Sequence, residues 1–125
     1  MIKTILEPQY DLTIQKCIGI ITDENFIKAI RSFYEENPTT NLIWDFSEAS
    51  LSITSNLFIK KISDLVKTLS GKSERTGKSA VIADGDLEFG LSRMFQMLTE
   101  NNNLSFKIKI CRTEEEARKW ILSEE

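Results

Sequence analysis

The stretch that decides the fold is LIWDFSEASLSITSNLFIKKISDLVKTL, residues 42–69. It opens with residues 42–46, a short and mostly apolar run that is typical of a buried strand. It continues through a polar segment rich in hydroxyl side chains. It ends in residues 58–69, where apolar side chains recur at helical spacing. A buried strand that leads through a polar loop into an amphipathic helix is the unit of open α/β sheets. Such sheets carry their functional groups where strands end and helices begin, so the polar segment is the candidate functional site.

Strand and helix patterns alternate on both sides of this unit. Alternating or short fully apolar runs predict strands at residues 2–6, 10–15, 17–21, 80–83 and 106–111. Helical spacing predicts helices over residues 26–34 and 87–98, and a final helix that follows Thr113. The order β-β-α-β-α-β-α-β-α is typical of an α/β fold. We therefore expect a mostly parallel mixed sheet with an antiparallel N-terminal strand or hairpin and about four helices.

Capping residues and glycines mark where these helices begin and end. Thr22 is a suitable N-cap for the first helix, and Thr113 with Glu116 has the pattern of a capping box. Gly71 is placed to end the second helix as a C-cap. Gly90 lies inside the third helix, where glycine costs up to about 1 kcal/mol relative to alanine. We expect a close approach of backbone or of a partner at that glycine.

Composition places the chain among globular proteins and excludes several functional classes. Its 125 residues, 41% hydrophobic and 28% charged, fit one domain over residues 1–125. The net charge of −3 argues against a nucleic-acid-binding protein, and the longest apolar run, residues 17–21, is too short for membrane insertion. The N-terminus lacks the pattern of a signal peptide, so we expect a cytoplasmic protein.

Histidine is absent from the chain. This removes the commonest general base, the Ser-His and Cys-His nucleophile pairs and most zinc sites. Cys17 and Cys111 each lie in an apolar strand-like run, which in a cytosolic chain is typical of buried thiols and not of a disulfide. We expect no enzyme activity, no cofactor and no catalytic metal.

The string GKSERTGKS, residues 71–79, has some features of a phosphate-binding loop. Five residues separate its glycines where the motif needs four, and the string precedes a strand instead of joining a strand to a helix. A polar linker is the better interpretation.

Three carboxylates follow neighbouring strands of the predicted sheet. Asp45 lies at the end of one strand, and Asp84 and Asp86 come after the next. Gathered at one edge of the sheet, they could hold magnesium for phosphoryl chemistry. We favour the simpler interpretation, in which Asp84 or Asp86 caps the third helix.

Two parts of the chain resemble a known family. The segment DFSEASLSITSNL, residues 45–57, is similar to the signature of the anti-sigma-factor antagonist (STAS) fold, in which a strand ending in Asp-Leu-Ser is followed by Asp-Ser-Ser-Gly-Leu. Residues 77–98 and 106–121 resemble the SpoIIAA-like proteins of bacteria, including the ending Glu116, Ala117, Arg118, Lys119, Trp120 and Ile121.

The resemblance implies a function for the polar segment. In regulatory STAS members the second serine of Asp-Ser-Ser-Gly is phosphorylated, and it corresponds to Ser55 here. Ile53, Thr54 and Asn56 replace the motif's aspartate, first serine and glycine. The SpoIIAA-like fold is also similar to lipid-binding CRAL-TRIO domains, which implies a small apolar ligand as an alternative.

Three hypotheses of different classes follow. The first is a non-enzymatic regulatory or protein-interaction module, whose candidate phosphoacceptor or partner surface comprises Ser55, Thr54, Asn56, Ser47 and Asp45. The second is a carrier of a small apolar or anionic ligand between the helices and the sheet. The third and weakest is a metal-dependent phosphoryl-transfer enzyme. We also expect a homodimer, formed through the sheet edge or through an exposed face of the third helix. That helix carries the large apolar residues Phe89, Met94, Phe95 and Met97.

Overall fold

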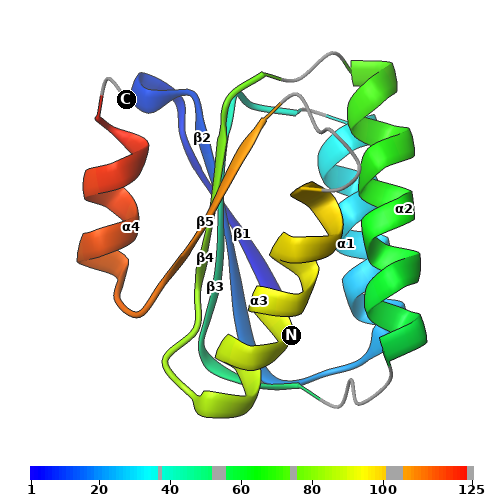
Figure 1. Cartoon of the computed structure of the whole chain (residues 1–125). Helices are drawn as coiled ribbons and strands as arrows, with labels where there is room; N and C mark the ends of the chain where they lie inside the picture. Colours follow the sequence, from blue (N-terminus) through cyan, green and yellow to red (C-terminus); the bar gives the residue numbers. More distant parts are fainter. Residues whose placement is uncertain (37, 52–55, 74–75, 101–105, 124–125) are drawn as a thin grey trace.

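The centre of the fold is a mixed sheet whose strands lie side by side in chain order (Figure 1). The computed structural model describes residues 1–36, 38–51, 56–73, 76–100 and 106–123. The described strands are β1 (Ile2–Glu7), β2 (Leu12–Ile21), β3 (Asn41–Leu51), β4 (Lys78–Ile82) and β5 (Lys107–Cys111). β1 runs antiparallel to β2, and the other neighbouring strands are parallel. The expected α/β fold with an antiparallel N-terminal strand is confirmed.

Helices cover both faces of the sheet unequally (Figure 1). α1 (Asp23–Glu35), α2 (Asn56–Ser73) and α3 (Asp86–Glu100) lie on one face, and α4 (Glu114–Ile121) lies on the other. Thr22 and Thr113 are confirmed as N-caps. Their side chains accept hydrogen bonds from Asn25 N and Glu116 N, respectively. Within the described ranges, no helix has both the length and the hydropathy that crossing a membrane requires.

Alternation along β3 divides its side chains between two cores. Leu42, Trp44 and Phe46 face the three-helix side, where Phe26 of α1 stacks on Trp44 with 4.8 Å between ring centroids. Ile43 points to the opposite side and packs in the smaller core beneath α4. Each large apolar side chain buried in this way contributes about 1.5–3 kcal/mol. The larger core therefore supplies most of the stabilisation of the sheet.

β3 is longer than the sequence pattern predicts. It continues past Phe46 to Leu51, where we expected a polar loop. Its second half pairs with β2, from Ile18↔Glu48 to Ile21↔Leu51, and backbone hydrogen bonds of this kind need no apolar side chains. β2 is likewise one strand and not two runs, with a shift of register between Lys16 and Ile18.

Two glycines differ from their sequence-based interpretation, and a third has a role that the sequence pattern did not indicate. α2 continues through Gly71 to Ser73, so Gly71 is not the predicted C-cap. Gly90 is exposed, and a Cβ there would meet no atom within 4 Å, so the expected close approach is absent among the described residues. A close approach does require glycine at position 77, because a Cβ added there would lie 1.8 Å from the backbone oxygen of Thr40.

Candidate functional site

The candidate site lies where β3 runs beyond β4. The pairing of β3 with β4 extends from Leu42 to Asp45, whereas its pairing with β2 continues to Leu51. Ile18–Ile21 of β2 and Glu48–Leu51 of β3 thus form a two-stranded arm. The arm lies at the bottom of Figure 1, at the carboxyl ends of the parallel strands, and leads towards the start of α1 and of α2. This edge of an α/β sheet is where functional groups gather.

Asp45 and Ser47 lie where the pairing of β3 with β4 ends. Asp45 Oδ1 accepts hydrogen bonds from Ser47 N at 2.9 Å and from Ser47 Oγ at 2.6 Å. The Asp45 side chain is buried, with 4% of the residue exposed, while Ser47 is exposed. A buried carboxylate needs such partners, and a bond to a charged acceptor is stronger than a neutral one. Asp45 therefore holds the backbone and the hydroxyl of Ser47 in one orientation.

A charged pair lies beside this turn. Lys16 Nζ of β2 is 3.1 Å from Glu48 Oε2, and both side chains are exposed to solvent. The hydrogen bond to Glu48, followed by its charge, raises the pKa of Lys16. Lys16 also pairs in register with Asp45. Just before the arm, Lys16 is therefore bonded to Glu48 and paired in register with a second acidic residue, Asp45.

The structure brings part of the predicted site together. Asp45 and Ser47 are in contact, as their spacing in the sequence allows. Asn56 is the first residue of α2. Thr54 and Ser55 lie outside the described residues.

The three carboxylates do not form the alternative metal site. Asp45 bonds Ser47, whereas the backbone oxygen of Asp84 accepts a hydrogen bond from Arg112 Nη1 at 3.2 Å. Arg112 Nη1 also lies 3.9 Å from Asp86 Oδ1, and its guanidinium covers the ring of Phe89 at 3.7 Å. Across the described part of the chain, no group of three or more acidic or cysteine side chains is placed to hold a metal ion. Arg112, which follows β5 directly, was not anticipated, because only the folded sheet brings it to the start of α3.

Lys78, the lysine of the phosphate-loop-like string, has a structural role. Its Nζ donates hydrogen bonds to the backbone oxygens of Trp120 and Ser123, at 2.9 and 2.8 Å. The same ammonium lies 5.3 Å from the centroid of the Trp120 ring. Lys78 therefore fastens the end of α4 to β4, which agrees with the interpretation that this string is not a phosphate site.

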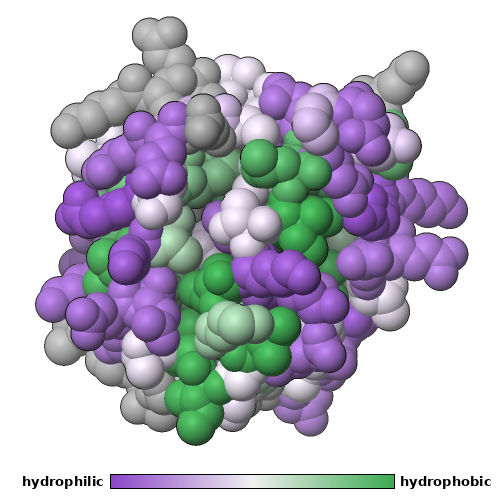
Figure 2. All heavy atoms as spheres, turned by 180° about the vertical axis from the view of Figure 1, so that it is seen from behind, coloured by the Kyte–Doolittle hydropathy of each residue, from purple (hydrophilic) through white to green (hydrophobic). Residues whose placement is uncertain are grey.

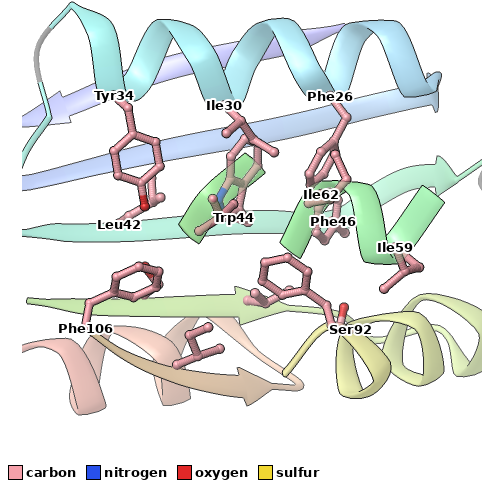
Figure 3. Close-up of a pocket in the computed structure, with 15 residues that line it drawn as sticks. Phe26, Ile30, Tyr34, Leu42, Trp44, Phe46, Ile59, Ile62, Ser92 and Phe106 are labelled. Atoms are coloured by element: carbon pink, nitrogen blue, oxygen red, sulfur yellow. The ribbon is translucent and has the colours of Figure 1, made fainter. Parts of the chain in front are cut away.

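A cavity of about 80 Å³ lies between the sheet and α1, α2 and α3 (Figure 3). Its walls are mostly aromatic and aliphatic side chains, among them Trp44 and Phe106. The hydroxyl-bearing side chains of Tyr34, Ser79 and Ser92 also line it. Ser79 is 5% exposed, and its Oγ has no hydrogen-bond partner among the described residues. None of the described side chains that line the cavity is charged.

No protein-family model matches the sequence, and no curated protein matches it. Several solved structures, however, are similar to this structure. The unphosphorylated form of the anti-sigma factor antagonist SpoIIAA superposes with a TM-score of 0.56 at 14% identity, covering 97% of both chains. The phosphorylated form of SpoIIAA, described as a Bacillus cell fate determinant, gives a TM-score of 0.54 at 14% identity over 97% of this chain and 99% of that one. The chain has the SpoIIAA-like fold.

A third structure extends the comparison to another SpoIIAA-like protein. It is an uncharacterised DUF3478 protein from Shewanella loihica, with a TM-score of 0.53 and 19% identity over 97% of this chain and 92% of that chain. The resemblance carried by residues 45–57, 77–98 and 106–121 is thus confirmed at the level of the fold. SpoIIAA itself exists in unphosphorylated and phosphorylated forms.

Proposed function

We propose that this protein is a non-enzymatic regulatory module that binds a partner protein. Its partner surface comprises the two-stranded arm, residues 52–55 and the first turn of α2. The SpoIIAA-like fold supports this proposal, since SpoIIAA is an anti-sigma factor antagonist.

The observation that carries the proposal is the open edge of β3. Beyond Asp45, the ladder between β3 and β4 ends, while β3 continues for the length of the arm. The side chains of Ser47, Glu48 and Ser50 along it are exposed. An edge that no described strand pairs with offers backbone groups to a partner, and the arm adds the exposed apolar side chain of Ile20. Such a surface suits a reversible contact.

Ser55 is the proposed switch for that contact, and Thr54 and Asn56 are its neighbours in the same surface. It immediately precedes α2, which begins at Asn56. A phosphate adds about 1.5 to 2 negative charges at neutral pH, and the amino end of a helix tolerates them. Phosphorylation would therefore change the charge of the partner surface without unfolding α2.

Phosphomimetic variants test this function. In affinity purification from the cells that make the protein, Ser55→Asp is expected to change the recovery of a specific partner about tenfold, since one charge-assisted hydrogen bond of about 1.5 kcal/mol is gained or lost. Thr68→Asp is the matched control, because Thr68 is exposed on α2 well after its first turn. Both variants should unfold at nearly the same denaturant concentration as the wild type. Equal recovery with all three proteins would contradict the proposal.

A second candidate function, supported by the cavity, is carriage of a small neutral ligand. The cavity has apolar walls and an unpartnered buried hydroxyl at Ser79. Leaving such a hydroxyl without a partner costs about 1–3 kcal/mol, and a ligand with one hydrogen-bonding group would remove that cost. At about 80 Å³ the cavity is roughly half the size of an apolar cavity that accepts benzene, so only a small group fits without movement of the walls.

Native mass spectra of the purified protein test this candidate. The wild type should carry a non-covalent adduct that Ser92→Leu lacks, because leucine fills the cavity from α3. Thr68→Leu makes the same change on the exposed face of α2 and should keep the adduct. Xenon provides a second probe, since it enters dry apolar cavities. It should shift the methyl resonances of Ile59 and Ile62 in the wild type and not in Ser92→Leu. No adduct and no xenon shift in the wild type would rule out the carrier.

A further inference from the structure

The outer edge of β1 has backbone groups that no described strand pairs with. Ile18 N donates to Met1 O at 2.8 Å, and Met1 N donates to Ile18 O at 2.9 Å, so these two residues form a hydrogen-bonded pair. Such pairs alternate along an antiparallel ladder. Lys3, Ile5 and Glu7 therefore bond to β2, whereas Ile2, Thr4 and Leu6 direct their N–H and C=O groups outward.

The two edges of the sheet differ in how they are protected. On β5, Lys107 and Lys109 are both exposed, which is a common protection against edge pairing. On β1 the one lysine is Lys3, and Leu6 is 57% exposed. Seen from the side opposite to Figure 1, apolar residues run as a band between two polar regions (Figure 2). Met1 and Leu6, at the two ends of β1, are large apolar side chains that are more than half exposed. The edge of β1 thus pairs with no described strand and carries an exposed leucine.

We propose that β1 pairs antiparallel with β1 of a second copy of this chain, with Thr4 opposite Thr4 of the partner subunit. The two sheets then form one continuous sheet around a two-fold axis at Thr4. This dimer is independent of the partner surface proposed above, which lies at the arm.

The backbone selects this register. With Thr4 on the axis, Ile2 lies opposite Leu6 of the partner subunit, and each outward residue of β1 forms a hydrogen-bonded pair. A shift by two residues places Thr4 opposite Leu6 of the partner subunit and leaves Ile2 without a partner residue in the strand. The register centred on Thr4 therefore satisfies more of the exposed backbone groups.

The side chains agree with the same register. On the three-helix face, Ile2 meets Leu6 of the partner subunit twice, which covers the exposed leucine with an apolar neighbour. On the α4 face, Lys3 lies opposite Ile5 of the partner subunit, and its diagonal neighbours are Glu7 of the partner subunit and Lys3 of the partner subunit. Glu7 is already bonded to Arg118, so the charged side chains do not select this register, and the apolar contact between Ile2 and Leu6 of the partner subunit does.

The exposed face of α3 offers less apolar surface than expected for the alternative dimer. Phe95 lines the internal cavity, and Phe89 is covered by the Arg112 guanidinium. Met97, 62% exposed, is the large apolar side chain that this helix presents among its described side chains. This leaves β1 as the better surface for a second copy.

Cross-linking of the full chain tests both the dimer and its register. Hydrogen-bonded antiparallel pairs have Cα atoms about 5.5 Å apart, which suits a disulfide. Thr4→Cys is therefore expected to give a disulfide-linked dimer on mild oxidation. Leu6→Cys is the matched control and should stay unlinked, because Leu6 faces Ile2 of the partner subunit. The native thiols of Cys17 and Cys111 are buried and do not interfere. Linkage of both variants or of neither would overturn the proposed register.

Sedimentation at micromolar concentration supplies a second readout without oxidation. The wild type and Thr4→Ala should sediment at twice the chain mass of 14.3 kDa, because alanine keeps the outward N–H. Thr4→Pro should sediment as a folded monomer, since proline removes that N–H and leaves the ladder to β2 intact. Leu6→Lys should also be monomeric, and it keeps the backbone unchanged if the proline variant does not fold. A monomeric wild type, or a dimeric Leu6→Lys, would overturn the proposal.

Discussion

Arg118 of α4 and Glu7 of β1 are joined by two hydrogen bonds across 111 positions of the chain. Nη1 donates to Oε1 at 2.9 Å and Nη2 donates to Oε2 at 2.6 Å, the geometry of a bidentate pair. Both side chains are partly buried. The hydrogen bond from Arg118 lowers the pKa of Glu7, and the bond to Glu7 raises that of Arg118. This pair fixes α4 over the β1 side of the sheet.

The pair should make stability depend on pH. Because the folded pKa of Glu7 lies below its ordinary value of 4.5, the pair contributes fully above that pH and is lost as the pH falls through the folded pKa. We expect Glu7→Gln to lower the free energy of unfolding by about 1 kcal/mol at neutral pH and by less at pH 3. Urea unfolding at both pH values measures this.

The exposed pair of Arg31 and Glu35 is the control for that measurement. Its atoms are 3.6 Å apart and both side chains are more than half exposed. Glu35→Gln should change the free energy of unfolding by less than about 0.5 kcal/mol at either pH. Equal effects of the two substitutions would contradict the role given to Glu7 and Arg118.

Two glycines should respond in opposite directions to alanine. Gly77→Ala places a Cβ 1.8 Å from the backbone oxygen of Thr40, and backbone cannot move aside cheaply. We expect a loss of about 1–3 kcal/mol or more in the free energy of unfolding. Gly90→Ala meets no atom within 4 Å and should gain about 0.5–1 kcal/mol from the better helix propensity of alanine. Denaturant unfolding of both variants measures the contrast, and a stabilising Gly77→Ala would show that the close approach is wrong.

The parts of the fold that could be predicted are those in which buried side chains recur in the sequence at the regular spacing of a strand or a helix. Leu42, Trp44 and Phe46 alternate because they enter one core, and Thr22 precedes α1 because its side chain completes the first turn. The second half of β3 could not be predicted in this way. Its residues Ser47 and Glu48 are exposed, and the strand there depends on its backbone pairing with β2.

The same distinction applies to the candidate site, where contacts between neighbours in the chain could be predicted and contacts between distant elements could not. Asp45 and Ser47 are neighbours in the chain, so their contact follows from local spacing. The cavity and the position of Arg112 depend on several elements meeting in space, which no local pattern records. Gly90 misled the prediction because glycine lowers helix propensity without always marking a close approach.

Both cysteines should be unreactive in the folded protein. The predicted buried thiols are confirmed, and burial is the main cause that raises the pKa of Cys17 to about 12 and of Cys111 to about 11. At pH 8 a disulfide reagent should label neither thiol faster than the protein unfolds, and it should label both in denaturant. Because these pKa values are raised, their contribution to stability is complete below the ordinary value of 9.0 and is lost as the pH rises above it. Rapid labelling of the folded protein would contradict the burial.

The unpartnered hydroxyl of Ser79 leads to the last prediction. In the ligand-free protein, Ser79→Ala removes a buried polar group that has no hydrogen bond to lose. We expect the free energy of unfolding to stay unchanged or to rise by about 1 kcal/mol. Thr13→Val is the matched comparison, because Thr13 Oγ1 is buried and lies 2.8 Å from Thr39 Oγ1. That change should cost about 0.5–1.5 kcal/mol, since it removes the bond between the two hydroxyls while Thr39 Oγ1 keeps its bond to the backbone oxygen of Asn41. If calorimetry shows equal losses for the two variants, Ser79 has a partner in solution, and the hydroxyl is not free to bind a ligand.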